Sequence, residues 1–240
     1  MALFGRLGRK AAAASAGAPA APDYKRAWND AARHDAHDAI LTGATAESFE
    51  RTGEADAAEI RRHLPPNVPA SVLNIGCGVG RVEKYLAPHV REMWAVDVSG
   101  EMIARAQERL AGLPAVRLRE IGNDEYLRSF EANHFDLVFS YLVLQHLARE
   151  DAFAYLRDAF RVLKPGGKLL VQFPNFLSPE YTRAFLEGAA AFPRSPGRVR
   201  FYTEPEARHI VALAGFEVEQ LRLSSGERGD TEIYVSARKP

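Results

Sequence analysis

A glycine-rich turn between two mostly apolar segments is the part of this 240-residue chain whose residue types and spacing best suit ligand chemistry. Gly76, Gly78 and Gly80 follow the segment Ser71–Ile75, and the next apolar segment ends in Asp97. Glycines let the backbone turn tightly and let a ligand lie against it without a Cβ in the way. An aspartate 21 positions after the first glycine can accept hydrogen bonds from both hydroxyls of a ribose. The spacing therefore predicts a site for a ribose-bearing cofactor.

The glycine spacing differs from that of dinucleotide-binding proteins. Their fingerprint, Gly-x-Gly-x-x-Gly, places the third glycine where it packs a helix on a strand and turns the helix N-terminus toward a pyrophosphate. Here the third glycine comes one residue early, at Gly80, and Arg81 and Val82 occupy the next two positions. An NAD-dependent oxidoreductase stays an alternative, although the sequence lacks both the required spacing and a recognisable group of residues for hydride transfer.

Two further blocks indicate which family the chain resembles. Residues 135–146 read Phe-Asp-Leu-Val-Phe-Ser-Tyr-Leu-Val-Leu-Gln-His, and residues 160–171 read Phe-Arg-Val-Leu-Lys-Pro-Gly-Gly-Lys-Leu-Leu-Val. With the glycine turn, in this order and spacing, they resemble the class I S-adenosylmethionine (SAM)-dependent methyltransferases over residues 70–175. The resemblance implies transfer of the sulfonium methyl group to a hydroxyl, amine or carbon of a small-molecule acceptor by in-line displacement. A catalytically silent partner subunit with the same fold is the alternative.

The alternation of strand and helix patterns predicts an α/β fold, with a doubly wound, mostly parallel sheet and helices on both faces. The predicted strands are residues 71–75, 92–98, 116–120, 135–140, 168–173, 216–223 and 231–238. The predicted helices are residues 24–41, 54–64, 100–110, 151–163 and 204–214, with a short helix after Pro179 and a turn at residues 164–167. The last two strands form an antiparallel hairpin. The resemblance implies a seven-stranded Rossmann-like sheet whose last strand is inserted antiparallel.

The residues just past the strand ends are expected to converge on one site, because parallel strands end at the same edge of a sheet. Asn74 stands where the family usually has an acid, so it can accept hydrogen bonds but lacks the charge that would pair with the methionine ammonium. Asn123 and Asp124 resemble the pair that contacts the adenine edge, with an Asx turn as the alternative. For Met102, core packing is the alternative to a contact with the adenine or ribose. The predicted cofactor-binding residues are Asn74, Gly76, Cys77, Gly78, Gly80, Asp97, Val98, Met102, Asn123, Asp124 and Ser140.

His146 and Tyr141 are the candidate catalytic residues. In methyl transfer the protein mainly positions donor and acceptor, since the sulfonium already activates the methyl carbon. A general base is needed only when the acceptor is a hydroxyl or a protonated nitrogen, and an imidazole titrates in the useful range. A structural, hydrogen-bonded histidine is the alternative. The other histidines form no metal-like group with cysteines or carboxylates, so no metal is expected.

Length and composition predict a single globular domain, and the resemblance implies a methyltransferase domain over residues 23–240. Lys plus Arg and Asp plus Glu both number 31, so the zero net charge offers no bulk attraction to nucleic acid. The single cysteine, Cys77, fits a reducing cytoplasm, and no apolar run approaches the length of a membrane span. Within the domain we expect a helical cap at residues 23–66 and an acceptor-side insert at residues 174–202. Residues 1–22 are typical of a disordered low-complexity arm, with a transit peptide as the alternative.

Overall fold

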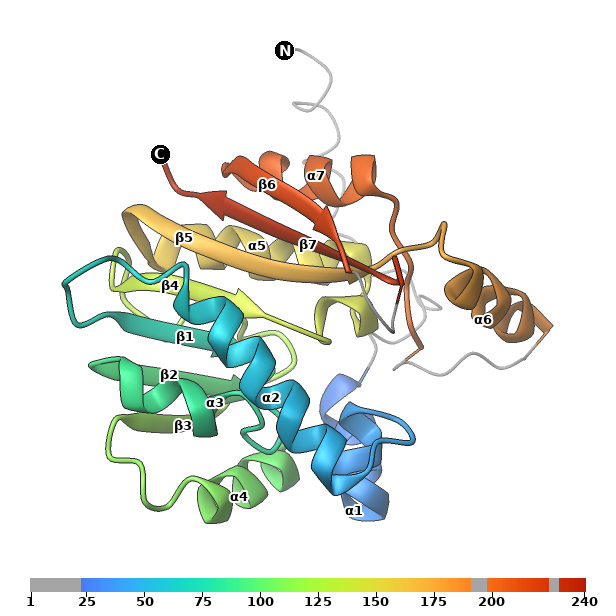
Figure 1. Cartoon of the computed structure of the whole chain (residues 1–240), viewed down its shortest axis with the longest axis horizontal. Coiled ribbons are helices and arrows are strands. Elements are labelled where there is room, and N and C mark those ends of the chain that lie inside the picture. Colours follow the sequence, from blue (N-terminus) through green and yellow to red (C-terminus); the bar gives the residue numbers. More distant parts are fainter. Residues whose placement is uncertain (1–22, 191–197, 225–228) are drawn as a thin grey trace, which may run out of the picture.

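A seven-stranded sheet forms the centre of the molecule (Figure 1). The computed structural model describes residues 23–190, 198–224 and 229–240, so the predicted arm at residues 1–22 lies outside the described residues. The first five strands run parallel, and the last strand in the chain is inserted antiparallel between the fifth and the sixth, which confirms the predicted sheet. The strand order is β3-β2-β1-β4-β5-β7-β6. The strands are β1 Ser71–Ile75, β2 Glu92–Asp97, β3 Val116–Glu120, β4 Phe135–Ser140, β5 Leu163–Pro174, β6 Glu217–Leu223 and β7 Glu232–Arg238.

Helices cover both faces of this sheet, as the sequence predicts for a doubly wound fold (Figure 1). Val72 of β1 belongs to the hydrophobic cluster under α2 and α3, whereas its neighbour Leu73 belongs to the cluster under α5 and α7. Every residue of β1 is buried, as expected for a central parallel strand. The helices are α1 Tyr24–Ile40, α2 Ala46–Arg61, α3 Glu83–Leu86, α4 Gly100–Arg109, α5 Arg149–Val162, α6 Pro179–Ala190 and α7 Glu204–Leu213, with 3-10 turns η1 Ala87–His89 and η2 Leu144–His146.

The second helix begins eight residues before its predicted start at Glu54. Thr45 caps α2, because its side chain accepts a hydrogen bond from the Ser48 amide. The buried stripe of α2 includes Phe49 and Gly53, and a Cβ on Gly53 would lie 2.5 Å from the carbonyl oxygen of Arg81. Because glycine has a low helix propensity, the sequence prediction started the helix after Gly53 and missed its first half.

The predicted turn at residues 164–167 is part of strand β5. Gly166 has the positive φ that the turn prediction required, +77°. Its amide donates to the carbonyl of Lys239, and the Lys239 amide donates to Gly167. Lys239 therefore pairs with these residues, which form an irregular extension of the strand instead of the predicted turn. Local sequence does not reveal this long-range partner.

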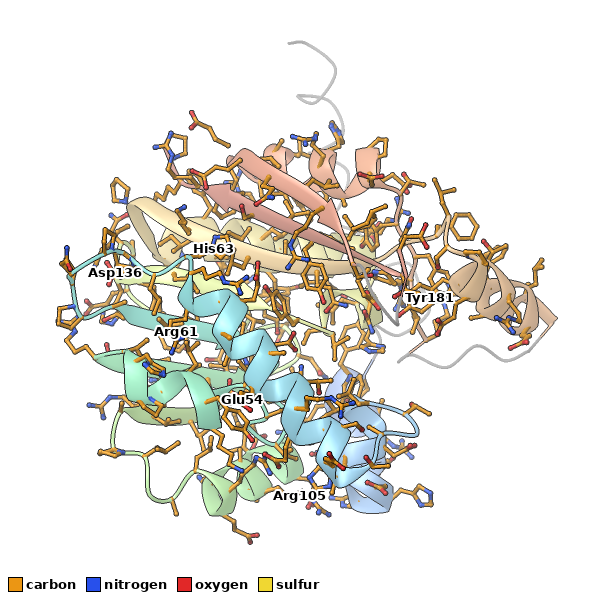
Figure 2. All side chains as sticks on the ribbon, viewed as in Figure 1. Glu54, Arg61, His63, Arg105, Asp136 and Tyr181 are labelled. Carbon is orange, nitrogen blue, oxygen red and sulfur yellow. The ribbon has the colours of Figure 1, made fainter. Side chains whose placement is uncertain are left out.

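Helix α1 lies at the edge of the sheet where β1, β2 and β4 end (Figure 1). The predicted continuous helix is interrupted at Asp35, whose φ and ψ of −156° and 106° are not helical. The Asp35 carboxylate accepts hydrogen bonds from the amides of His37 and Asp38, which restart the helix. Helix α6 projects from the same end of the molecule, and Figure 2 shows Tyr181 reaching from it toward β7. Within the described part of the chain, no helix has the length and apolar character needed to cross a membrane.

Candidate functional site

A cavity of about 900 Å³, counted with the open space at its mouth, lies at the carboxyl ends of β1, β2 and β4. This is the edge of a parallel sheet where ligands bind in doubly wound folds, and the size is in the range of small-molecule sites. Nine of the predicted site residues line it: Asn74, Gly76, Cys77, Gly78, Asp97, Val98, Met102, Tyr141 and His146. The other lining residues are Tyr24, Trp28, Ala39, Ile40, Ile75, Arg81, Val82, Ile121, Phe139, Leu142, Val143, Leu147 and Tyr155.

The first glycine of the turn forms part of the cavity floor. Gly76 has φ +79°, and its amide donates to the carbonyl of Val96 in β2 at 2.7 Å. A Cβ on Gly76 would lie 2.2 Å from Cγ2 of Val143, so only glycine leaves room here. Gly80 does not line the cavity: its φ is +81° and its Cβ would meet Leu110 of the neighbouring helix segment at 2.6 Å. Both glycines therefore allow close packing, and Gly76 in addition lines the cavity, whereas Gly80 does not.

Replacing Gly76 with alanine is expected to destabilise the fold by about 2–5 kcal/mol. A left-handed backbone costs roughly 1–2 kcal/mol for a residue with a Cβ, and overpacking against Val143 costs roughly 1–3 kcal/mol more. Urea unfolding measures the difference in free energy. Gly112→Ala is the matched control, because nothing lies within 4 Å of a Cβ at that position. Equal stability of the two variants would contradict the steric argument.

Asp97 ends β2 and presents its carboxylate to the cavity. One oxygen accepts a hydrogen bond from the Gly78 amide and the other from the Ser99 amide, both at 2.9 Å. Burial, opposed by these hydrogen bonds, raises the pKa of Asp97, and the nearby Glu120 adds to the rise. Each carboxylate oxygen keeps a lone pair for a ligand hydroxyl. Ser99, and not Asp97, caps α4, as its hydroxyl accepts from the Met102 amide at 3.1 Å.

Helix α1 supplies one wall of the cavity through Tyr24 and Trp28 in its first half. The Tyr24 hydroxyl donates to Asp151 Oδ2 and accepts from the Ala148 amide, each at 2.8 Å. Burial raises the pKa of Tyr24 to about 12, so the phenol keeps its proton and can donate. Helix α1, the first part of the predicted cap, therefore borders the cavity and is held there by part-buried polar contacts.

Removing this hydroxyl with Tyr24→Phe is expected to destabilise the docking of α1 by about 1–3 kcal/mol, because the Ala148 amide loses its acceptor. Hydrogen exchange of the α1 amides measures the local effect. Tyr126→Phe is the comparison variant, since Tyr126 bonds the other oxygen of Asp151 without belonging to α1. Faster exchange in both variants alike would show that Asp151, and not the Tyr24 contact, controls the docking.

His146 reaches the cavity from the end of η2. Its ring meets that of Trp28 edge-on, with centroids 4.9 Å apart, and its Nε2 pairs with Gln145 Nε2 at 3.2 Å. The His146 carbonyl accepts from the Arg200 side chain at 2.7 Å, and the Arg200 amide donates to the Gln145 carbonyl. These backbone contacts anchor the segment that carries the imidazole at the cavity wall.

Tyr141 and Ser140 end β4 but face different surroundings. The Tyr141 ring packs edge-on against Phe139 and Tyr234, and burial raises the pKa of its phenol. A phenol with a raised pKa stays protonated and is poorly suited to act as a base. Ser140 does not line the cavity; its hydroxyl is fully buried and donates to the carbonyl of Ile75, joining β4 to β1.

The structure does not bring Asn123 and Asp124 to the cavity. The Asn123 side chain accepts from the Lys25 amide and donates to Asp23, so it ties this loop to the start of α1. Asp124 is exposed. From the same loop, Ile121 lines the cavity instead. The resemblance implied an adenine contact for this pair, whereas the contact of Asn123 with the start of α1 depends on the long-range fold.

Arg81 and Leu142 line the cavity but are absent from the predicted site. Leu142 has φ +63°, and its amide donates to the Gln172 side chain at 2.9 Å. Arg81 directly follows the third glycine, so its place in the sequence could have indicated that it lies near the site. Tyr155 reaches the cavity from the middle of α5, where no local pattern distinguishes it from core residues.

Comparisons with known proteins agree with this geometry. Residues 73–171 match the family model of the methyltransferase domain. An uncharacterized protein in a transposon of Streptomyces fradiae is 35% identical over 171 residues, 70% of this chain and 46% of that protein. A probable SAM-dependent methyltransferase of Mycolicibacterium smegmatis is 32% identical over 148 residues, 62% of this chain and 52% of that protein. The chain spans about half the length of these two relatives.

A solved structure shows the same fold. Magnesium protoporphyrin IX methyltransferase from Synechocystis, with bound S-adenosylhomocysteine (SAH), matches with a TM-score of 0.68 and 21% identity. The match covers 90% of this chain and 98% of that one. The likeness extends beyond the methyltransferase domain match, to most of the sheet and its helices.

Proposed function

Because this chain belongs to the class I SAM-dependent methyltransferases, we propose that it transfers the methyl group of SAM to a hydroxyl, amine or carbon of a small-molecule acceptor. One observation carries the proposal: a single cavity is lined by Gly76, Gly78 and Asp97 and also by His146 and Trp28. A ribose-bearing donor and an acceptor can therefore meet inside one enclosure. When bound, SAM supplies a methyl group on a positively charged sulfur.

The residues present fit this donor. Gly76 and Gly78 line the cavity without side chains, and Val143 and Ile40 pack so close to them that a Cβ would not fit. Asp97 is suited to bind the ribose hydroxyls, and Met102 and Val98 offer apolar surface beside it. We propose these residues, with Asn74 and Cys77, as the donor site. Burial raises the pKa of the Cys77 thiol, which keeps it neutral and unsuited to act as a nucleophile.

Apart from the proposed donor site, the cavity lining is mostly apolar and aromatic and includes Trp28, Leu147 and Tyr155. An apolar enclosure favours a small acceptor with an apolar body. We propose His146 as the base that takes a proton from an acceptor hydroxyl or protonated nitrogen, and we propose no base role for Tyr141. We also propose residues 23–66 as a cap and residues 174–202 as an acceptor-side insert, although no described residue of the insert lines the cavity.

Calorimetric binding of SAH, SAM and NAD to the purified full chain is the first test. We expect micromolar binding of SAH and SAM and none of NAD. Transfer of labelled methyl from SAM to hydroxyl, amine and activated-carbon acceptors then identifies the acceptor class. Binding of NAD without SAH would favour an oxidoreductase, and binding of SAH without transfer to any acceptor would favour a silent partner subunit.

A further inference from the structure

Leu142 of the cavity wall has a backbone conformation that residues other than glycine rarely adopt. Its φ is +63°, in the left-handed region, and such a conformation persists only where the surroundings hold it. The next residue, Val143, also lines the cavity, and a Cβ on Gly76 would lie 2.2 Å from its Cγ2. The conformation of Leu142 therefore decides where the Val143 side chain meets the glycine turn.

One buried side chain holds the Leu142 backbone. The Leu142 amide donates to Oε1 of Gln172 at 2.9 Å, and Gln172 lies in β5, is 2% exposed and does not line the cavity. Its neighbours in the strand, Val171 and Phe173, are buried apolar residues of the core. Burying an amide in such a strand is unfavourable unless its polar atoms are hydrogen-bonded. Core packing alone thus gives no reason for a glutamine at this position.

A buried acid orients the Gln172 amide. Nε2 of Gln172 donates to Oε2 of Glu232 at 2.5 Å, and Glu232, in β7, is 3% exposed. Because a carboxylate oxygen accepts hydrogen bonds, Glu232 selects the NH2 end of the amide. Oε1 of Gln172 is then the end left for the Leu142 amide.

Helix α6 contributes the last member of this chain of hydrogen bonds. The Tyr181 hydroxyl donates to Oε1 of Glu232 at 2.5 Å, and Figure 2 shows this tyrosine reaching from α6 toward β7. Tyr181 is partly buried, whereas every other residue within the range 179–189 of α6 is exposed. The Tyr181 hydroxyl therefore connects an otherwise exposed helix to the buried side chains.

We propose that Gln172 is a positioning residue for the cavity wall, which holds Leu142, and with it Val143, in the conformation that binds the methyl donor. Glu232 and Tyr181 orient Gln172 from β7 and α6. Helix α6 thus acts on the cavity without lining it, and its attachment adjusts donor affinity. The inference rests on the proposed function, since the affinity for SAH reports it.

The amide resonance of Leu142 in the unliganded full chain tests the contacts. A hydrogen bond moves the resonance of an amide proton downfield, so Gln172→Leu should shift the Leu142 resonance upfield. Tyr181→Phe should move the same resonance, since it removes a hydrogen bond to Glu232. Gln220→Leu is the matched control, the same change at an exposed glutamine of β6 outside the cavity. A Leu142 resonance that stays in place in Gln172→Leu or in Tyr181→Phe would overturn the proposed chain.

Calorimetry with SAH measures the effect on binding. We expect Gln172→Leu to weaken SAH binding by about 3–10-fold, the contribution of one hydrogen bond, and Gln220→Leu to leave it unchanged. Tyr181→Phe should weaken binding less. The double variant Gln172→Leu with Tyr181→Phe should bind SAH no more weakly than Gln172→Leu alone, because both changes act through the same amide.

An exchange of the acid and the amide separates positioning from packing. Gln172→Glu alone sets two carboxyl groups against each other and should weaken SAH binding. Adding Glu232→Gln restores every hydrogen bond of the chain, since the introduced amide donates to position 172 and its oxygen accepts from Tyr181. SAH affinity and the Leu142 resonance should then return toward their wild-type values.

The outcomes distinguish this inference from the proposed function. If the wild type binds SAH and Gln172→Leu binds it equally tightly, Gln172 does not position the wall while the proposed function stands. The same conclusion follows if the exchange fails to recover the affinity lost in Gln172→Glu. If the folded wild type binds no SAH, the proposed function fails and the inference about donor affinity fails with it.

Discussion

Asp97→Ala is expected to weaken SAH binding by about 10²–10⁴-fold. Hydrogen bonds to a charged group contribute roughly 1.5–3 kcal/mol each, and the Asp97 carboxylate can accept one from each ribose hydroxyl. The cavity offers no other lining carboxylate in the described part of the chain to replace it. Calorimetric dissociation constants at one pH measure the loss.

The same substitution removes the acceptor of the Gly78 and Ser99 amides, so the fold of the variant needs a separate check. Near-ultraviolet circular dichroism of the unliganded variant provides it. Asp124→Ala is the comparison, because this exposed aspartate follows β3 yet lies outside the cavity. If the folded Asp124→Ala variant bound SAH comparably weakly, the adenine contact would lie in that loop. If Asp97→Ala bound SAH as tightly as the wild type, Asp97 would not bind the ribose.

His146→Asn is expected to lower kcat by about 10²–10⁴-fold for acceptors that must lose a proton, the usual contribution of a general base. The asparagine keeps a polar group beside Trp28 but cannot take the proton. Donor affinity should stay within a few-fold of the wild type, since the substitution leaves the glycine turn and Asp97 unchanged. Steady-state rates, with SAH dissociation constants beside them, separate the two effects.

The control for this experiment is His209→Asn, an exposed histidine of α7 that does not line the cavity. A second comparison uses an acceptor with no proton to lose, for which His146→Asn should leave the rate nearly unchanged. An equal loss for both acceptor types would indicate that the ring only shapes the cavity. A parallel loss of SAH affinity would indicate that it contacts the donor.

The sequence predicted the elements that local pattern determines. Strands β1, β3 and β4 begin and end at the predicted residues. β1 and β4 are short, mostly apolar runs, and β3 alternates apolar and charged residues. The capping box at Thr203 and Glu206 likewise opens α7 as predicted. The predicted start of α2 was wrong because the prediction used helix propensity, which disfavours Gly53. In the structure, close packing of the helix against Arg81 requires a glycine at this position.

The same division holds for the candidate site. The spacing of Gly76, Gly78 and Asp97 in the sequence was enough to predict that they lie together, and all three line one cavity. Glu83, which accepts a hydrogen bond from the Asn74 side chain, had no such signal: it lies nine positions after Asn74 in a helix of four residues, and nothing local marks a glutamate as buried. This contact exists only once α3 packs against β1. Long-range packing also explains Asn123, which the start of α1 draws away from the cavity.

Helix α1 is fastened on both sides of the cavity. Asn29 accepts a hydrogen bond from Ser99 of the loop after β2 at 2.8 Å, while Tyr24 bonds Asp151 of α5. The same helix lines the cavity. We therefore expect undocking of α1 to open the cavity and to limit how fast ligands leave it.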